Sequence, residues 1–599
     1  MRGNPIPESN EAENWGVLKR LVPYLTEFKW RVILALLFLV GAKLATTGMP
    51  FMVKGIVDQL GAKENTDTSA WLLAPVGLVF VYGALRFANV LFGEIRDTLF
   101  GRVTERAMRR VAHEVFVHLH QLDLAYHLNR KTGAVSRDIE RGVSGISFLL
   151  RFMVFSILPA LIEILLVVGI LLFQYGWSFG LTTFVAIVVY IFYSMKVTNW
   201  RRAFLREANT ADSASSSRAI DSLLNYETVK YYTNESFEAD RYDVNLQQLE
   251  QAKRKNRLSL FVLNGGQALI ISLSMTAMML LAVLGVQDGQ MSVGDFVLVN
   301  AFMMQLFIPL GSLGFVYREI KTSMINIEQL FNILDVPPQI TDVPDAAALQ
   351  ISSGQITFSD VSFHYRQDRE IISKLNLNIE AGQTVAVVGP SGSGKSTLVK
   401  LLFRFYDPTS GAISIDDQNL KAVTQNSLRK AIGIVPQETV LFNDSIWENI
   451  RYGCPEASDE AVEKAISMAY LDDFIKQLPD GTETQVGERG LKLSGGEKQR
   501  VAIARTILKK PPIMVFDEAT SSLDSHAERM ILDAISELSK NTTSLVIAHR
   551  LSTVVNADKI CVLVQGALAE QGTHQELLKL GGVYASLWAA QQEEEDTSF

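Results

Sequence analysis

The sequence GPSGSGKS occupies residues 389–396, between an apolar run at 384–388 and a segment at 397–405 with the composition of a helix. The run predicts a buried strand and the segment predicts the start of a helix, so the glycine-rich stretch joins the two. Glycines let successive backbone N–H groups converge on phosphate oxygens, and a helix N-terminus favours an anion. The stretch therefore predicts a site for the phosphates of a nucleotide.

Residues of this loop are candidate ligands of ATP. The spacing places the charge of Lys395 on the β- and γ-phosphates and the hydroxyl of Ser396 on Mg²⁺. The alternative, a Gly/Ser-rich turn that binds nothing, leaves the flanking strand and helix unexplained. The expected ATP-binding residues here are Gly389, Pro390, Ser391, Gly392, Ser393, Gly394, Lys395, Ser396 and Thr397.

Two carboxylates follow a second short apolar run, at residues 513–516. This run predicts another buried strand, which ends in Asp517 and Glu518. We expect Asp517 to hold Mg²⁺ and Glu518 to polarise the water that attacks the γ-phosphate. An acidic strand end is also a common surface feature, but its position after a phosphate loop favours the catalytic interpretation.

The sequence LSGGE at residues 493–497 resembles the signature motif of the ABC ATPases, and the resemblance extends over residues 354–590. In that family the signature of one nucleotide-binding domain completes the phosphate site of another. The resemblance therefore places Ser494, Gly495 and Gly496 at a γ-phosphate held by a partner. Because one chain has one set of motifs, we expect at least a dimer, and a homodimer is the simplest arrangement.

The same resemblance assigns roles to residues outside the loop. It implies that Tyr365 stacks on adenine and that Gln437 senses Mg²⁺ and contacts the membrane domain. It also implies that Asp524 couples paired sites and that His549 contacts the γ-phosphate, as a catalytic residue beside Glu518. The expected cofactors are ATP and Mg²⁺, with Ser396, Gln437 and Asp517 as magnesium ligands.

The first 335 residues have a different composition. Hydrophobic residues make up 48% of the 599-residue chain, the mean hydropathy is +0.16, and the apolar residues gather in long stretches. Six stretches are long enough to cross a hydrocarbon core of about 30 Å at about 1.5 Å per residue. The predicted spans are residues 31–53, 72–96, 148–174, 177–198, 260–286 and 296–317.

Basic residues are unequally distributed between these spans. Eight Lys and Arg lie between Phe100 and Gly145 and eleven between Met195 and Arg257, whereas the linkers at 174–176 and 287–290 have none. Basic loops remain in the cytoplasm, so we expect both termini and the ATPase domain there. The long basic loops have helical periodicity, which predicts that the spans continue as helices into the cytoplasm.

Three shorter segments have expected positions of their own. Residues 120–131 and 222–229 are candidates for the coupling segments that meet the ATPase domain, and residues 15–28 suit a helix in the membrane interface. The N-terminus carries three glutamates against one arginine, which argues against a mitochondrial transit peptide and favours a bacterial inner membrane. The acidic tail is expected to be solvated and disordered.

Six spans joined to an ABC domain resemble the type IV ABC exporters. We therefore expect an α-helical polytopic membrane domain with long cytoplasmic extensions, fused to an α/β phosphate-loop ABC ATPase domain. The expected boundaries are residues 1–335 for the membrane domain, 336–353 for a linker, 354–590 for the nucleotide-binding domain and 591–599 for the acidic tail.

Stretches of the membrane half resemble a narrower group, the mitochondrial-type exporters linked to iron–sulfur biogenesis and heavy-metal tolerance, whose bacterial relatives export glutathione conjugates. These stretches are residues 118–142, 200–204, 219–230 and 309–320. The resemblance implies a glutathione pocket made of Tyr190, Arg201, Asn264, Gln267, Gly311, Ser312 and Gly314. An arginine with Asn and Gln donors suits the carboxylates and amides of glutathione.

Two alternatives for the pocket residues stay open. Arg201 also suits a basic face that contacts anionic lipid, and Asn264 and Gln267 also suit hydrogen bonds between helices. Many members of the group have a second arginine four positions after the first, where this chain has Leu205. The leucine at this position changes how this chain would recognise the carboxylates of glutathione.

The predicted function is ATP-driven export of glutathione-related compounds by alternating access. A lipid or multidrug exporter is the alternative within the class, and an ATP-gated channel or regulator is the alternative outside it. The expected partners are a second copy of the chain, the bilayer and a small-molecule cargo. The net charge of −8 gives no reason to expect nucleic acid, and the two cysteines have no metal-ligand spacing.

Overall fold

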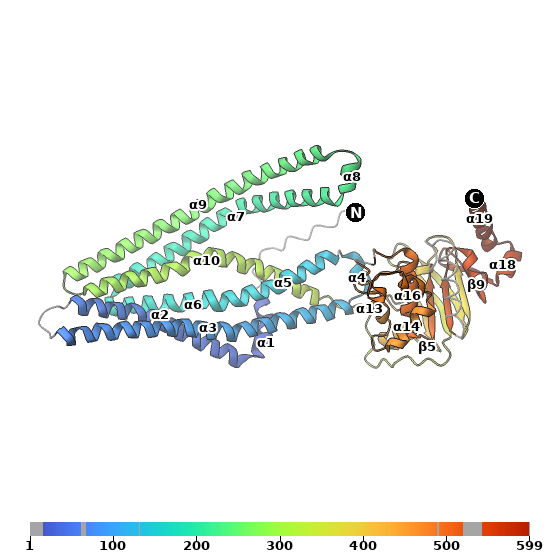
Figure 1. Ribbon diagram of the computed structural model, residues 1–599, viewed down its shortest axis with the longest axis horizontal. Coiled ribbons are helices and arrows are strands. Elements are labelled where there is room, and N and C mark those ends of the chain that lie inside the picture. Colours follow the sequence, from blue (N-terminus) through green and yellow to red (C-terminus); the bar gives the residue numbers. More distant parts are fainter. Residues whose placement is uncertain are drawn as a thin grey trace. The chain divides into compact units, whose positions relative to one another are not determined.

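The computed structural model describes residues 16–61, 68–130, 132–487, 490, 492–518 and 542–597. The chain divides into two compact units (Figure 1). The helical unit comprises Met1–Gln121 and Arg130–Val336, and the α/β unit comprises Leu122–Asn129 and Pro337–Phe599. The first candidate coupling segment therefore folds mainly with the α/β unit, although the helical unit flanks it in the sequence.

The helical unit consists of long helices that pass back and forth along its long axis (Figure 1). Six helices among the described residues are long and apolar enough to cross a membrane, which confirms the predicted fold class. A helix bonds its own backbone N–H and C=O groups, as a hydrocarbon environment requires. The elements are α1 (Gly16–Thr26), α2 (Lys29–Gly61), α3 (Thr68–Gln121), α5 (Thr132–Phe152), a π-helical turn (Met153–Ile157), α6 (Leu158–Tyr175), α7 (Trp177–Leu224), α8 (Tyr226–Tyr231), α9 (Glu235–Gln287) and α10 (Val293–Leu334).

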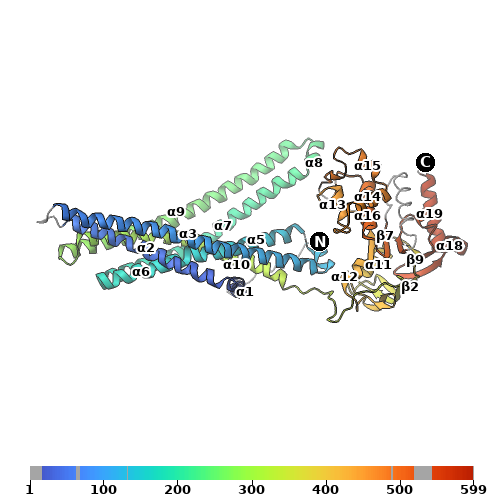
Figure 2. The same ribbon diagram turned by 60° about the horizontal axis from the view of Figure 1, so that its bottom comes forward.

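Helices α7 and α9 lie side by side and are joined by the short α8 (Figures 1 and 2). Both continue without a break from an apolar half into a charged half, as the periodicity of the basic loops predicted. In the charged half, ion pairs join the two helices. Lys255 Nζ lies 2.7 Å from Glu207 Oε1, and Arg218 Nη2 lies 2.8 Å from Glu238 Oε1.

The N-terminal helix α1 packs on the helical unit by polar contacts. The guanidinium of Arg20 pairs with Asp335, just after the end of α10, and lies 5.0 Å from the ring centroid of Phe331. Tyr24 Oη donates to Glu114 Oε2 on α3 at 2.8 Å. The predicted interfacial segment at 15–28 is thus mostly helical, with Trp15 outside the described residues.

The α/β unit contains two sheets. One is antiparallel in the order β2-β1-β4-β5, and the other has the order β10-β9-β3-β8-β7-β6, with its central strands parallel. The parallel strands β3 and β7 consist mostly of buried apolar residues, as sheets covered on both faces require, and β8 adds buried Thr543 and Ser544 to its apolar residues. The strands are β1 (Ile356–Phe363), β2 (Ile372–Ile379), β3 (Thr384–Val388), β4 (Ser410–Ile415), β5 (Gln418–Asn419), β6 (Ile432–Val435), β7 (Ile513–Asp517), β8 (Thr543–Ile547), β9 (Lys559–Val564) and β10 (Ala567–Gly572).

The core of this unit lies between the two sheets and around helix α11. Leu398 and Leu402 of α11 are fully buried among residues of both sheets, including Ile356 and Val385. A second cluster packs α16 against β6 and β7. The α-helices of the unit are α4 (Leu124–Asn129), α11 (Lys395–Leu402), α12 (Gln425–Ala431), α13 (Ile446–Arg451), α14 (Asp459–Met468), α15 (Asp472–Lys476), α16 (Gly495–Lys509), α18 (His574–Leu580) and α19 (Val583–Thr597).

Asp416 fixes the start of the antiparallel sheet. Its carboxylate accepts the backbone N–H groups of Ser352, Ser353, Gly354 and Gln355 at 2.7–3.0 Å. Burial opposes ionisation, but these donors and the Ser353 hydroxyl hold the pKa of the Asp416 carboxyl well below its ordinary value. One ionised side chain thus satisfies a run of backbone donors.

The prediction of a disordered tail is wrong for most of the tail. Helix α19 begins at Val583 and extends to Thr597, so the acidic residues from Glu593 onward continue an anchored helix. Tyr584 is fully buried at its start and bonds His574 Nδ1 of α18 at 2.7 Å. The residues after Tyr584 include Ala, Gln and Glu, which favour helix once an end is fixed.

Candidate nucleotide site and membrane pathway

Four parallel strands bring the nucleotide motifs to one edge of a sheet. The strands β3, β8, β7 and β6 are neighbours in that order, and Val387, Ile547 and Asp517 stand in register across the first three. The phosphate loop follows β3, Glu518 follows β7, and Gln437 and His549 follow two residues after β6 and β8. Carboxyl ends of parallel strands meet at one edge, which is where open α/β sheets bind ligands.

The phosphate loop has the backbone that its glycines allow. Gly394 has φ of 104° and is the N-cap of α11, and Gly389 has φ of 150°. A Cβ atom at Gly389 would meet the carbonyl oxygen of Leu563. Ser396 is exposed beside these glycines, at the second residue of α11. The loop therefore presents a helix N-terminus and a hydroxyl on its open side.

Lys395 is folded back onto the loop. Its Nζ donates to the carbonyl oxygens of Gly389 at 2.7 Å and Pro390 at 3.2 Å, and the residue is 6% exposed. Burial lowers the pKa of the Lys395 ammonium, against the opposing charges of Glu518 and Asp517. The negative charge of an anion bound at the loop would offset the cost of burying this ammonium.

Asp517 has the chemistry of a magnesium ligand. Its Oδ1 is buried and accepts no hydrogen bond from the part of the chain that the structure describes. Burial, and after it the charge of Glu518, raises the pKa of the Asp517 carboxyl. Among the described residues no cluster of three His, Cys, Asp or Glu side chains could hold a metal by itself. One carboxylate, one hydroxyl and substrate phosphates are the ligands that Mg²⁺ ordinarily takes in such sites.

Glu518 lies beside Gln437. Gln437 Nε2 donates to Glu518 Oε2 at 2.5 Å, and the backbone N–H of Glu518 donates to the carbonyl of Ile547 at 2.9 Å. Glu518 has φ of 50°, a left-handed conformation that side chains other than glycine adopt infrequently. His549 is exposed on the adjacent strand end, and its carbonyl accepts from Gln591 Nε2 at 2.6 Å.

Tyr365 is close to the helix of the phosphate loop. The residue follows β1 after one intervening position and is 43% exposed. Its hydroxyl lies 3.2 Å from Thr397 Oγ1 on α11. The ring predicted to stack on adenine is thus tied to the loop predicted to bind phosphate.

The signature motif opens helix α16. Ser494 is its N-cap, and Ser494 and Glu497 form a capping box in which each side chain accepts the other's backbone N–H. Ser494 and Gly495 are exposed and Gly496 is partly buried, so this 15-residue helix has an accessible N-terminus suited to an anion. Asp524, predicted to couple paired sites, lies outside the described residues.

The predicted cargo residues divide between buried and exposed positions. Arg201 is 7% exposed, and its Nε and Nη2 donate to Ser259 Oγ at 3.0 Å and Asn256 Oδ1 at 3.3 Å. Gln267 is 8% exposed and donates to Ser194 Oγ at 2.8 Å. These bonds join α7 to α9, which is the interhelical alternative for Gln267.

The remaining predicted cargo residues lie on α7, α9 and α10. Tyr190 of α7 is buried, with its ring centroid 6.3 Å from that of Phe307 on α10. Asn264 of α9 and Gly311 of α10 are exposed in the single chain. Ser312 and Gly314 also belong to α10, and their surroundings lie outside what the structure describes.

Sequence reasoning missed ion pairs inside the predicted spans and at their ends. Lys43 of α2 and Glu163 of α6 form an ion pair, with Nζ 2.8 Å from Oε2 and the carboxylate side chain 5% exposed. Asp295 at the start of α10 pairs with Lys54 of α2 and accepts the Tyr175 hydroxyl of α6 at 2.5 Å. A lone charge inside an apolar stretch is the signal that could have identified Lys43 and Glu163.

Two family models match this chain. One, described as ABC transporter transmembrane region, matches residues 32–310, and the other, described as ABC transporter, matches residues 372–521. The matches coincide with the apolar helices and with the sheet that carries the nucleotide motifs.

Curated relatives and a solved structure cover nearly the whole chain. The mitochondrial "Iron-sulfur clusters transporter atm1" of Aspergillus fumigatus is 47% identical over 98% of this chain and 81% of the relative. The mitochondrial "Iron-sulfur clusters transporter ABCB7" of Oryzias latipes is 45% identical over 99% of this chain and 81% of the relative. A structure titled "a bacterial Atm1-family ABC exporter with ATP bound" superposes with a TM-score of 0.81 at 45% identity, over 94% of this chain and 98% of that chain. This chain is therefore a member of the Atm1/ABCB7 family of ABC transporters, a multi-pass, ATP-hydrolysing exporter.

Proposed function

We propose that two copies of this chain form the working exporter and that the cargo is a glutathione-related compound. The cargo class comprises oxidised glutathione, glutathione conjugates and metal–glutathione complexes. The proposed location is a bacterial inner membrane, with both termini and the α/β unit in the cytoplasm. Digestion of the α/β unit by protease added to inside-out vesicles tests this orientation, and complete protection would contradict it.

The observation that carries the cargo proposal is the buried guanidinium of Arg201. It lies between α7 and α9, and its Nε and Nη2 donate to neutral oxygen atoms of Ser259 and Asn256. A guanidinium binds a carboxylate through two parallel hydrogen bonds, and glutathione carries carboxylates at both ends. The names of the relatives refer to iron–sulfur clusters, and the thiol of glutathione joins metal chemistry to this anionic cargo.

Leu205 marks where recognition differs within the family pattern. It occupies the position of a second arginine, and it is half-buried on α7, one helical turn after Arg201. With one arginine in place of two at this position, the chain would depend more strongly on Arg201. Arg206 is exposed on the same helix, which makes it a matched control.

ATPase stimulation in proteoliposomes tests the cargo. We expect oxidised glutathione or a metal–glutathione complex to stimulate ATP hydrolysis. Arg201→Ala is expected to lower the apparent affinity for this cargo at least about tenfold, because a charge-assisted pair is lost. Arg206→Ala is expected to leave the affinity unchanged. Stimulation by hydrophobic drugs alone would replace this proposal with the multidrug alternative. Flux measured against a gradient separates either exporter from a channel.

The proposed ATP reaction assigns a distinct task to each strand end. The Lys395 ammonium, released from Gly389 and Pro390, pairs with the β- and γ-phosphates, and Glu518 accepts hydrogen bonding from the attacking water. Mg²⁺ bound by Ser396, Gln437 and Asp517 would neutralise phosphate charge. The exposed N-terminus of α16 suits the γ-phosphate of a partner.

The dimer is supported by surfaces that the single chain leaves exposed. Around α8, the second candidate coupling segment, Leu224, Tyr226 and Tyr231 are 79%, 58% and 78% exposed. Apolar and aromatic side chains at a helical tip outside the predicted membrane spans suit contact with another protein surface. Mixed dimers of wild-type and Glu518→Gln chains test whether the working exporter is a dimer. A non-additive loss of activity supports paired sites, and activity proportional to the wild-type fraction would contradict them.

A further inference from the structure

Three aromatic rings meet at the end of β1, beside the phosphate loop. The ring centroids of Phe363 and Tyr365 are 4.9 Å apart, and those of Tyr365 and Tyr406 are 5.1 Å apart at an interplanar angle of 87°. Phe363 and Tyr406 complete the triangle with centroids 5.5 Å apart. Edge-to-face contacts of this kind fix the orientation of the rings.

Tyr365 depends on these contacts for its orientation. The residue is 43% exposed, so solvent covers much of its ring. Thr397 Oγ1, 3.2 Å away, holds the hydroxyl end, whereas Phe363 and Tyr406 contact the ring itself, with Lys400 Nζ 5.6 Å from its centroid. Phe363 is nearly fully buried in β1. Tyr406 is the ring whose position is set by a turn.

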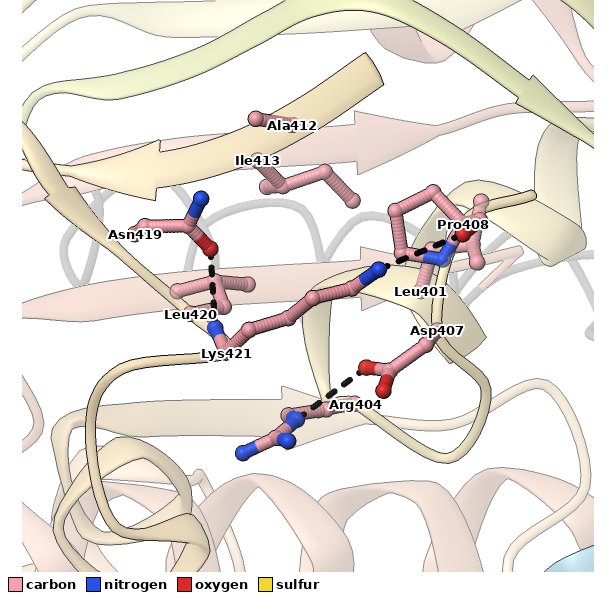
Figure 3. A pocket seen from close by; sticks show the side chains of 9 residues that line it. All are labelled: Leu401, Arg404, Asp407, Pro408, Ala412, Ile413, Asn419, Leu420 and Lys421. Atoms are coloured by element: carbon pink, nitrogen blue, oxygen red, sulfur yellow. Dashed lines mark hydrogen bonds and ion pairs between the residues drawn. The ribbon is translucent and has the colours of Figure 1, made fainter. Parts of the chain in front are cut away.

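That turn is held rigidly by two arginines. Arg404 is 4% exposed, has φ of 51°, and donates from Nε to Asp407 Oδ1 at 3.1 Å (Figure 3). Arg429 Nε donates to the carbonyl of Phe403 at 3.2 Å, and its Nη2 donates to the carbonyl of Arg404 at 3.2 Å. Hydrogen bonds therefore hold the backbone before Tyr406 and the side chain of Asp407 after it.

The same turn is also bonded to the strand that carries Tyr365. The backbone N–H of Thr409 donates to the carbonyl of Ser362 in β1 at 2.9 Å. Figure 3 shows Asp407 and Pro408 in this turn, next to a pocket lined by Leu420 and Lys421 that is too small for a nucleotide. The bonded turn holds Tyr406 at a fixed distance from β1.

We propose that Tyr406 is a positioning residue for the nucleotide base. Its ring holds Tyr365 in the orientation that stacks on adenine, so that it raises the affinity for ATP without contacting it. This inference rests on the proposed role of Tyr365. An aromatic pair contributes enough that its loss weakens ATP binding by about two- to tenfold.

Steady-state ATPase kinetics of the full-length chain in lipid nanodiscs test the proposal. Tyr406→Leu is expected to raise KM for ATP about two- to tenfold with kcat unchanged at saturation, and Tyr406→Phe to restore wild-type values because it keeps the ring. Inhibition by inorganic tripolyphosphate is expected to stay unchanged in Tyr406→Leu, because this ligand has no base. If Tyr406 had a purely structural role, its loss would weaken the binding of both ATP and tripolyphosphate.

A double-mutant cycle separates this inference from the proposed role of Tyr365. Tyr406→Leu in a Tyr365→Leu background is expected to add nothing, since it acts through the lost ring. Additive effects, an unchanged KM or equal weakening of tripolyphosphate would overturn the inference. If Tyr365→Leu raises KM and Tyr406→Leu does not, only the inference fails; if Tyr365→Leu itself has no effect, the role of Tyr365 fails first.

Two further variants keep the test decisive. Tyr470→Leu replaces an exposed tyrosine elsewhere in the α/β unit and is expected to leave KM for ATP unchanged. Should Tyr406→Leu not fold, Tyr406→Met fills a similar volume without a ring and carries the same expectation. A Tyr406→Met chain that folds and keeps wild-type KM would overturn the inference.

Discussion

Gln437 Nε2 donates to Glu518 Oε2 at 2.5 Å, and this bond joins residues 81 positions apart. It exists because β6 and β7 are parallel neighbours, with Val435 opposite Phe516. Glu518 also has a strained φ of 50°, which persists where surrounding bonds enforce it. The amide thus holds the carboxylate at the sheet edge.

The first prediction concerns catalysis by Glu518. Glu518→Gln keeps the size of the side chain but removes the base, so turnover is expected to fall about 10²- to 10⁴-fold while ATP binding remains. Steady-state hydrolysis and equilibrium nucleotide binding in the same preparation measure the two quantities. Undiminished hydrolysis in the Gln variant would refute the assigned role.

The second prediction concerns the pH dependence of ATP binding through Lys395. Burial lowers the pKa of this ammonium in the free protein, and phosphate charges would raise it again on binding. ATP affinity is therefore expected to fall as pH rises through the lowered pKa. Binding of Mg·ATP across the alkaline range measures the slope.

Lys395→Arg provides the control for that slope, because a guanidinium stays charged throughout the range. Its affinity is expected to be lower but nearly independent of pH. The sign for folding is opposite. The unfolded state holds the proton more tightly, so the nucleotide-free fold gains stability as pH rises between the lowered pKa and the ordinary one. If ATP affinity had the same pH dependence in the wild-type chain and in Lys395→Arg, the pairing of Lys395 with phosphate would be contradicted.

The third prediction concerns stability at Asp416. Asp416→Asn replaces an ionised acceptor of several backbone N–H groups with a neutral one, and is expected to cost about 1–3 kcal/mol in free energy of unfolding. Because the folded pKa is lowered, the contribution is complete above the ordinary pKa and is lost as pH falls through the folded value. Denaturant unfolding of the full chain against pH measures this.

Asp417→Asn is the matched control for Asp416. Asp417 is the next residue, also has a positive φ, and is exposed, so its replacement is expected to change stability little. The acid-dependent loss should then be absent from Asp416→Asn and present in Asp417→Asn. The opposite pattern would show that the nest of N–H groups does not depend on Asp416.

The sequence predicted the fold where local pattern decides it. The runs at 384–388 and 513–516 become β3 and β7 because apolar runs beside glycine-rich or acidic ends are typical of buried parallel strands. It did not predict the bond between Gln437 and Glu518, because the order of strands in a sheet depends on contacts distant in sequence. The sequence pattern predicts disorder for the tail because its residues are acidic. The helix forms because Tyr584 is buried at its start, which the charge pattern does not reveal.

The candidate cargo residues show the same limit. Gln267 and Asn264 are three positions apart on α9, yet one is buried against α7 and the other is exposed. Sequence spacing gives their relative angle on the helix, but only packing decides which face meets a neighbour. Lys43 and Glu163 were visible as charges inside apolar spans, and their pairing required the approach of α2 to α6.

The last prediction concerns that ion pair. Glu163→Gln removes one partner of a pair in which the Glu163 and Lys43 side chains are 5% and 20% exposed. An uncompensated charge inside a helical bundle is expensive, so we expect a loss of about 3–5 kcal/mol. Thermal unfolding in nanodiscs measures it. Asp212→Asn, which breaks the pair with Lys253 at 57% and 61% exposure, is expected to cost under about 1 kcal/mol.

A second variant separates pairing from packing at this site. Lys43→Met with Glu163→Gln removes both charges, so the double variant is expected to recover most of the stability that Glu163→Gln loses. Recovery would show that the unpaired ammonium of Lys43 causes the loss. If the double variant is as unstable as the single one, the carboxylate acts through shape and not through charge. If it also loses transport while keeping ATP hydrolysis, the pair belongs to the pathway between α2 and α6, as an intramembrane charge suggests.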